Sequence, residues 1–278
     1  MNRILLLVLL VPQSACLAHE SQSPATSSQA TYIANAGVMV SHGDLKVMFD
    51  PFFRDGFGVY DLVPAAMEAA ILAGEVPYDG IDALFVSHYH GDHFDPLTVL
   101  NYLQRWPDVH LYAPEQALRV LSDRRAEDIP EVWSRVHGIQ LQRDSAAVVF
   151  ETDQFVVEAI RIAHAGWPDR HADVENIAYR VTLDEITTVV HLGDADAGKQ
   201  HYEPHQEFWQ SRKTDVAFVP VWLMLTDKGR HVLNQHVEAA SEIGIHVYKN
   251  VAKDPAIRDE KFDGIDLFTE PGETRMIK

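Results

Sequence analysis

The sequence predicts an α/β fold in which two mixed β-sheets pack face to face with helices on their outer sides, a four-layer αββα sandwich. Strand patterns occur in two groups, before residue 115 and after residue 138, and helical patterns accompany both groups. Sheets and amphipathic helices each have to bury an apolar face, so such a chain packs in layers with its helices outside. The 278 residues, 46% of them hydrophobic, suffice for one large domain with a substantial core.

Alternation, helical spacing and capping residues define the elements of the first group. In chain order they are a β-hairpin over 31–51, a helix over 62–77, a strand over 81–87, a helix over 95–108, a strand over 109–114 and a helix over 115–125. The hairpin turns at Ser41–Asp44, and its second strand ends at Asp50. The first helix stops at Gly74, and the second has Asp95 as its N-cap and Pro96 at its first position.

Strands dominate the second group. Apolar runs predict strands over 139–142, 146–152, 154–164, 176–183 and 187–194. The remaining elements are a helix over 203–213, a strand over 216–222, a helix over 229–243 and a final strand over 244–248. No internal repeat of short fixed period accompanies them, which argues against a solenoid.

The first 30 residues differ in character from the rest. Residues 1–18 begin with a short polar segment containing Arg3, continue with an apolar run and end in small residues, a pattern typical of a secretory signal peptide cleaved after Ala18. The apolar run is too short for a stable membrane span. Residues 19–30 are polar and serine-rich, which indicates a flexible lead-in to a domain over 31–278.

The only cysteine, Cys16, lies in this leader. A lipoprotein is the alternative interpretation, in which Cys16 carries a lipid anchor, although Gln13 stands where a lipobox normally has leucine. Both interpretations predict export, either to the periplasm or medium or to a membrane surface. Neither leaves an intramolecular disulfide or a thiolate ligand in the mature domain.

The charge excludes one class of partner. The formal net charge is −18, and no cluster of lysines and arginines interrupts it. Such a chain repels phosphate backbones, so we expect no nucleic-acid partner.

Residues 87–95, SHYHGDHFD, place three histidines and two aspartates directly after a buried strand. His88 and His90 alternate, so at a strand end they project to one side and can share an ion. Asp92 and His93 fall on the turn into the next helix, where they can meet a second ion. Imidazole nitrogens with a carboxylate suit zinc, and also manganese or iron. A solvated histidine-rich loop is the alternative, but the position at the end of a buried strand favours a metal site.

One loop cannot supply all the ligands of such a site. His164, Asp194 and His246 each follow or end another apolar run, where a polar side chain is typically a cap or part of a site.

These motifs carry a family resemblance. SHYHGDHFD matches the HxHxDH signature of the metallo-β-lactamase superfamily, which the chain resembles over roughly residues 31–250. Asp50 at a strand end, HxHxDH, a later histidine, Gly-Asp and a final histidine follow the order of that family's motifs. DALFVSHYHGDHFD, VVHLGDAD and IGIHVY are most similar to the branch that includes L-ascorbate-6-phosphate lactonase and N-acyl-phosphatidylethanolamine phospholipase D.

The resemblance implies two divalent metal ions, most simply Zn²⁺ with Mn²⁺ or Fe²⁺ as alternatives, and divides the ligands between them. The first ion would be bound by His88, His90 and His164. The second would be bound by Asp92, His93 and His246. Asp194 would bridge the two ions, and Asp50 would orient the metal-binding loop from behind.

The implied activity is that of a metal-dependent hydrolase. A hydroxide shared by the two ions would attack an ester, lactone, amide or phosphodiester, while Asp92 orients it and can shuttle its proton. A β-lactamase and a glyoxalase II-like thioesterase are alternatives within the enzymes. A non-catalytic metal-binding or sensing protein on the same fold is the alternative outside them.

Other histidines compete for roles at this site. His171 lies near His164 in sequence and is the alternative ligand at that position. His231 and His236 compete with His246, but their helical pattern places them on an exposed face. For His191, His201 and His205 we expect packing or surface positions rather than contacts with substrate.

Two apolar segments are candidates for the walls of a substrate pocket. Residues 52–80 combine aromatic and apolar side chains between Asp50 and the metal loop, although an ordinary outer helix explains them equally well. Residues 221–231 would expose Trp222, Leu223 and Met224 at a strand end. Two such walls suit a small-molecule or lipid-like substrate.

Overall fold

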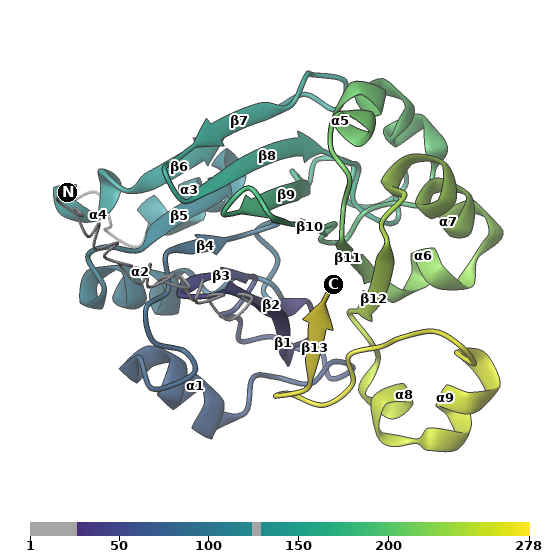
Figure 1. Ribbon diagram of the computed structural model, residues 1–278, viewed down its shortest axis with the longest axis horizontal. Coiled ribbons are helices and arrows are strands. Elements are labelled where there is room, and N and C mark those ends of the chain that lie inside the picture. Colours follow the sequence, from purple (N-terminus) through teal and green to yellow (C-terminus); the bar gives the residue numbers. More distant parts are fainter. Residues whose placement is uncertain (1–26, 124–128) are drawn as a thin grey trace, which may run out of the picture.

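The structure is a computed structural model that describes residues 27–123 and 129–278. The predicted signal peptide, residues 1–18 with Cys16, lies outside the described residues, as does most of the predicted lead-in. The first strand begins at Ser28, so the lead-in ends earlier than residue 30, where we expected it. Figure 1 shows two sheets packed face to face with helices beside them, which confirms the αββα sandwich.

The first sheet has seven strands in the order β13-β1-β2-β3-β4-β5-β6. They are β1 (Ser28–Ala34), β2 (Gly37–His42), β3 (Leu45–Phe49), β4 (Ala83–Phe85), β5 (His110–Pro114), β6 (Val136–Ile139) and β13 (Thr274–Ile277). The pairs formed by β13, β1, β2 and β3 are antiparallel, and the pairs from β3 to β6 are parallel.

The second sheet has six strands in the order β12-β11-β10-β9-β8-β7. They are β7 (Val148–Glu151), β8 (Phe155–Arg161), β9 (Ile177–Leu183), β10 (Thr187–His191), β11 (Val216–Pro220) and β12 (Ser241–Ile245). The pairs from β7 to β10 are antiparallel, and β10, β11 and β12 are parallel. Both sheets are therefore mixed, as predicted.

Helices cover the outer face of each sheet. Against the first sheet pack α1 (Ala65–Ala73), α2 (Pro96–Arg105), α3 (Glu115–Ser122) and α4 (Pro130–Trp133). Against the second pack α5 (Gln206–Ser211), α6 (Val221–Leu225), α7 (Asp227–Val232) and the π-helical turn η4 (Leu233–Val237), with the short 3₁₀ turns η2 (Lys199–His201) and η3 (Glu203–His205) beside them. The pair α8 (Lys249–Lys253) and α9 (Pro255–Lys261) follows β12 and lies at the lower right of Figure 1.

The alternation of side chains along the strands builds the layers. In β2, Val38 and Val40 point into the core between the sheets, and Met39 between them points into the core under the outer helices. Phe85 of β4 and Tyr179 of β9 meet in the central core with their ring centroids 5.1 Å apart. Burial on both faces is what fixes the register of these strands.

Several predicted elements are confirmed at their ends. Gly74 caps α1 in the left-handed conformation, with φ of 68°. Asp95 caps α2, where its side chain accepts a 2.8 Å hydrogen bond from the backbone N–H of Thr98. Pro96 occupies the first position of α2, as the sequence predicted.

Other elements differ from the prediction. The first predicted strand breaks at Asn35, whose φ of 51° turns the chain between β1 and β2. Residues 221 and 222 begin α6 instead of ending a strand. The predicted helix over 229–243 stops at Glu238, because residues 241–245 pair with β11 as β12. The strand expected over 139–142 lies earlier, at 136–139. None of the helices in residues 27–123 and 129–278 is long and apolar enough to cross a membrane.

Candidate metal centre

The structure brings all seven candidate ligands together at one edge of the sandwich. The metal-binding loop follows β4 of the first sheet, whereas His164, Asp194 and His246 follow β8, β10 and β12 of the second. Three groups have their ligand atoms within 4.8 Å of one another: His88, His90 and His164; His88, His93 and Asp194; and Asp92, His93 and His246. The first and third groups are the two ligand sets that the resemblance implies.

Asp50 fixes the loop from behind. It lies just past the end of β3, and its carboxylate accepts hydrogen bonds from the backbone N–H of Ser87 at 2.7 Å and from the Ser87 hydroxyl at 2.6 Å. The same carboxylate accepts a third from His93 Nδ1 at 2.8 Å. All three groups are buried. Asp50 therefore fixes the start of the loop and the orientation of one ligand ring.

These bonds determine which ring nitrogens face the centre without a proton. His93 donates through Nδ1 to a carboxylate that can only accept, so Nε2 of the neutral ring carries a lone pair. His164 likewise donates through Nδ1 to the backbone oxygen of Ala165 at 2.8 Å. Because the Ser87 hydroxyl donates to Asp50, it accepts from His88 Nδ1 at 3.0 Å. The Nε2 lone pairs of His88 and His164 thus point toward the cluster, and His93 Nε2 offers a third once it gives up its proton to a bound cation.

Asp194 lies between the two ligand groups and presents one oxygen to each. Its Oδ2 is 3.3 Å from His164 Nε2, on the side of the first group. Its Oδ1 is 3.2 Å from His93 Nε2 and 3.4 Å from His246 Nε2, on the side of the second. The backbone N–H of Asp194 donates to Asn176 Oδ1 at 2.9 Å, which fixes the carboxylate in this position.

Two further ligands, Asp92 and His246, are held by the turn between β1 and β2. Asp92 Oδ2 is 3.1 Å from His246 Nε2. Asn35 donates from Nδ2 to the backbone oxygen of Asp92 at 2.9 Å, and its own backbone oxygen accepts from the N–H of His246 at 2.8 Å. One turn residue therefore positions two ligands from opposite sheets.

The charges around the cluster favour a cation. Burial lowers the pKa of His88 well below its ordinary value and that of His90 to about 4, so both rings are neutral and able to bind an ion. Burial acts in the same direction at His93, but the carboxylates of Asp194 and Asp92 outweigh it and raise the pKa. Positive charge is therefore stabilised beside these carboxylates.

The donor set passes a direct test of fit to divalent ions. Among the described residues, His164 Nε2 and Asp194 Oδ1 are buried without a hydrogen-bond partner, and His164 Nε2 lies 3.3 Å from Asp194 Oδ2. Acceptors that face acceptors in a buried site repel one another unless a cation lies between them. Imidazoles with carboxylates are also the ligands that zinc and its neighbours prefer.

The competing histidines have other positions. His171 is exposed, with its ring centroid 4.7 Å from that of His164, and it stays outside the three ligand groups, as do His231 and His236. His191 packs on Phe49 with centroids 5.0 Å apart and bonds through Nε2 to the backbone oxygen of Ala36. His201 and His205 are likewise buried.

Two aromatic side chains pack on His246, one from each of the two predicted walls of the substrate pocket. The ring centroid of Tyr60 lies 4.2 Å from that of His246, and the ring centroid of Trp222 lies 5.2 Å from it. Trp222 is half-buried and donates from Nε1 to the backbone oxygen of Ala195. The prediction that Leu223 and Met224 are exposed at a strand end was wrong, because α6 turns both into the core beside the second sheet.

Three supporting residues were missed from the sequence. Asn35, Ser87 and Asn176 are buried and touch the ligands through hydrogen bonds. Only Ser87 had a signal, since it directly precedes the first ligand histidine. Asn35 and Asn176 are far from the motif in sequence, so only the folded chain shows their contacts.

Two cavities lie beside the centre. One of about 730 Å³ is lined by Trp167, Pro168, Asp196, Ala197, Gly198, Lys199, Gln200, Asp227, Lys228 and His231. A second of about 580 Å³, here called the apolar groove, is lined by Gly58, Val59, Leu225, Tyr248, Lys249, Asn250, Val251, Ile257, Lys261 and Phe262. Both volumes are in the range of small-molecule sites.

The two mixed sheets with a histidine–aspartate cluster at the ends of their strands define a class of protein, the metal-dependent hydrolases with a metallo-β-lactamase fold. Residues 46–249, well over half of the chain, match the family model described as a beta-lactamase superfamily domain. The chain belongs to the beta-lactamase superfamily. No curated protein matches it in sequence.

Solved structures share the fold at low sequence identity. A metallo hydrolase from the archaeon Ignicoccus hospitalis has 14% identity and a TM-score of 0.59 over 91% of this chain and 99% of that chain. A possible metal-dependent hydrolase from Veillonella parvula has 15% identity and a TM-score of 0.60 over 90% of this chain and 99% of that chain. An isothiocyanate hydrolase from Delia radicum gut bacteria has 13% identity and a TM-score of 0.57 over 89% of this chain and 98% of that chain.

Proposed function

We propose that this protein is an exported hydrolase with two divalent ions, most simply Zn²⁺, that cleaves an ester, lactone, amide or phosphodiester. The observation that carries the proposal is the placement of Asp194, which presents one carboxylate oxygen to each of two three-ligand groups. When bound, the ions supply an acidified water for attack and polarise the group that is attacked.

The side chains around that position have separate tasks. His88, His90 and His164 would hold one ion, and Asp92, His93 and His246 the other. The carboxylate of Asp92 can also orient the attacking water and take up its proton for transfer to the leaving group. Asp50 keeps the proton of His93 on Nδ1, so that the lone pair of Nε2 stays available to bind a metal ion.

Export is a proposal that rests on the leader sequence. Residues 1–18 have the polar start, apolar run and small-residue end of a signal peptide, and Cys16 offers a lipid anchor as the alternative. Mass spectrometry of the protein purified from a bacterial host decides between an N-terminus at His19 and a lipidated Cys16.

A metal analysis combined with a hydrolytic screen tests the activity. The mature protein should bind about two metal ions per chain and hydrolyse at least one class among lactones, thioesters, β-lactams, phosphodiesters and N-acyl phospholipids. Isothiocyanates belong in the screen because one protein of similar fold is an isothiocyanate hydrolase.

Asp194→Asn is the decisive variant in this screen. Loss of the bridging charge should abolish the activity and reduce the bound metal. Asp196→Asn makes the same substitution two residues further along the same loop and should retain the bound metal. One bound ion or none in the wild type, with no hydrolysis after metal supplementation, would contradict the proposal and favour a binding protein.

A further inference from the structure

Exposed apolar side chains lie on three segments near the metal centre. Phe57, Val59 and Leu62 are 57%, 41% and 48% exposed and belong to one loop between β3 and α1. Leu225 at the end of α6 and Tyr248 before α8 are 44% and 47% exposed. Val59, Leu225 and Tyr248 line the apolar groove. Such clustering is typical of a binding site, whereas scattered exposed residues are not.

The walls of the groove are tied to each other. The backbone N–H of Lys249 donates to the backbone oxygen of Val59 at 2.9 Å, and Lys253 of α8 pairs with Asp61 at 2.7 Å. Val251 and Phe262 are buried at its base. The groove is therefore a formed feature between the loop and the pair α8 and α9.

Two connections join the groove to the candidate centre. Tyr248 stacks on Tyr60 with centroids 5.3 Å apart, and Tyr60 lies against the ligand His246. On the other side, α6 places Trp222 against His246 and Leu225 in the groove. A molecule in the groove therefore lies beside the ligands of the second group.

The charge of the groove has one sign. Lys249 and Lys261 are its only charged lining residues, on a chain whose formal net charge is −18. Neither forms an ion pair among residues 27–123 and 129–278, whereas the neighbouring Lys253 does. The larger cavity differs, because Asp196 and Asp227 accompany its lysines. An apolar groove edged by unpaired lysines matches an alkyl chain that carries an anionic group.

We infer that the apolar groove is the chain-binding subsite of the proposed hydrolase and that its substrates are single-chain acyl compounds with an anionic group. The alkyl chain lies along Val59, Leu225 and Tyr248, and the anionic group meets Lys249 or Lys261. The scissile bond then lies at the ligands beside Tyr60. This assignment rests on the proposed function, whose site it shares.

Binding of sodium decanoate to the metal-loaded mature protein, measured by calorimetry, tests the groove. Sodium acetate carries the same carboxylate without the chain, so it corrects for direct binding to metal. Decanoate should bind at least about tenfold more tightly than acetate, since each buried methylene contributes to the affinity. Val59→Asp and Leu225→Asp should each weaken decanoate binding about tenfold, because they place a like charge in an apolar groove.

Matched variants make the result specific. Ile186→Asp places the same charge on another apolar side chain, 66% exposed in the turn between β9 and β10, and should leave decanoate binding and hydrolysis unchanged. Lys249→Glu combined with Lys261→Glu should weaken decanoate binding and leave the affinity for decanol unchanged. Circular dichroism and metal content verify that each variant is folded.

Three results would overturn the inference: decanoate binding no tighter than acetate, equal losses in Ile186→Asp, or a wild-type dimer that Val59→Asp dissociates. The last would show that a second copy of the chain covers these residues. Failure of the proposed function has a different signature, in which metal and hydrolysis are absent while decanoate still binds and Val59→Asp still weakens it.

Discussion

Asp50 illustrates how the centre depends on residues that lie behind the ligands. Its carboxylate is fully buried, and it accepts from two groups of Ser87 and from one ligand histidine. Its backbone φ of 42° lies in the left-handed region, which is uncommon for a residue with a side chain. Strain of this kind persists where the surroundings fix the backbone firmly, and it is frequent at functional sites.

Asp50→Asn should weaken metal binding by about 10- to 100-fold, because the amide no longer offers a negative acceptor to His93 Nδ1. Competition with a chromogenic chelator measures the affinity. Asp95→Asn is the matched control, since Asp95 ends the metal-binding loop and its side chain caps α2. An unchanged affinity in Asp50→Asn would show that the orientation of the ring does not depend on this carboxylate.

At the residue scale, the motif chemistry could be predicted and its support could not. A strand end followed by histidines and aspartates at alternating positions is a local pattern, so His88, His90, Asp92 and His93 are recognisable without a structure. Asn35 contacts Asp92, which is 57 positions later in the chain, and also His246, which follows a strand of the other sheet. No local pattern encodes such a contact.

At the scale of elements, the prediction failed where tertiary pairing outweighed local preference. The pattern of residues 229–243 predicted one helix. Residues 241–245 nevertheless form the strand β12, because β11 offers a parallel partner. β13 completes the first sheet by pairing with β1, which is about 245 positions earlier. The helices with caps were predicted correctly, since Asp95, Pro96 and Gly74 determine their ends locally.

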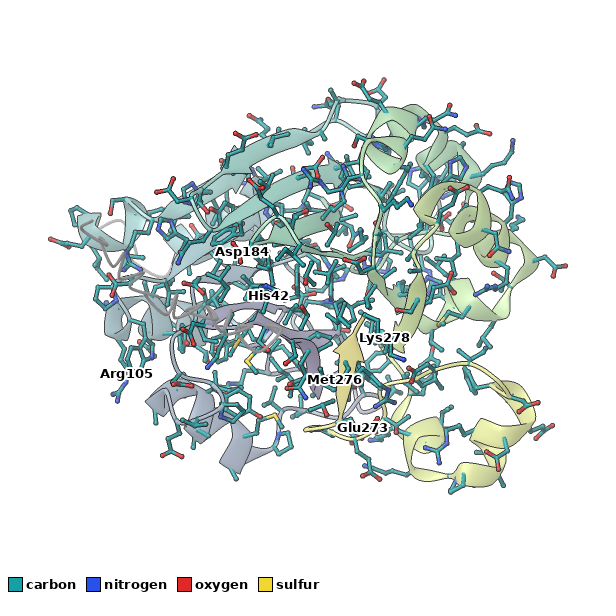
Figure 2. The ribbon with its side chains drawn as sticks, in the orientation of Figure 1. His42, Arg105, Asp184, Glu273, Met276 and Lys278 are labelled. Atoms are coloured by element: carbon teal, nitrogen blue, oxygen red, sulfur yellow. The ribbon has the colours of Figure 1, made fainter. Side chains whose placement is uncertain are left out.

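A cluster of hydroxyls and one histidine joins the two sheets at the end of β2 that lies away from the centre. Ser28 Oγ is 2.7 Å from His42 Nδ1 and 2.5 Å from Thr187 Oγ1, and all three side chains are buried. Asp184, in the turn between β9 and β10, lies 3.8 Å from His42 Nε2, and Figure 2 shows the two side by side. First-sheet and second-sheet residues thus share one polar network.

Thr187→Val should lower the free energy of unfolding by about 1 kcal/mol, because it preserves the shape of the side chain and removes the hydroxyl on which two buried partners depend. Urea unfolding of the metal-loaded protein measures the loss. Thr187→Ser retains the hydroxyl and should lose less than Thr187→Val. Equal losses in the two variants would assign the effect to the methyl group instead of the hydrogen bonds.

At the scale of the whole molecule, histidines held neutral by burial make stability depend on pH. Burial lowers the pKa of His88, His90, His110, His137, His191, His201 and His205. In the unfolded chain each takes up a proton below a pH of about 6.5, which the folded state resists. Among the histidine ligands with a shifted pKa, only His93 has a raised pKa, so its effect on stability has the opposite sign.

The metal-free protein should therefore lose stability as the pH falls from about 7.5 to 5.5. Each histidine that stays neutral contributes a slope of up to about 1.4 kcal/mol per pH unit below its unfolded pKa. Urea unfolding at both pH values measures the change. His191→Gln retains a donor for the backbone oxygen of Ala36 and should show a shallower dependence than the wild type. A urea midpoint of unfolding that is higher at pH 5.5 than at pH 7.5 would contradict the assignment of these histidines as neutral in the folded protein.

The division of the ligands between the two sheets has a consequence for the stability of the fold. His88 and His93 follow the first sheet, and His164 and His246 follow the second, so a cation among them cross-links segments far apart in the chain. Cross-links of this kind reduce the conformational entropy of the unfolded chain, as disulfides do. The sequence has a single cysteine, Cys16, so it can form no intramolecular disulfide. Ions bound among these ligands would then also hold the two halves of the sandwich together, and a chelator would remove the metal and this stabilisation at once.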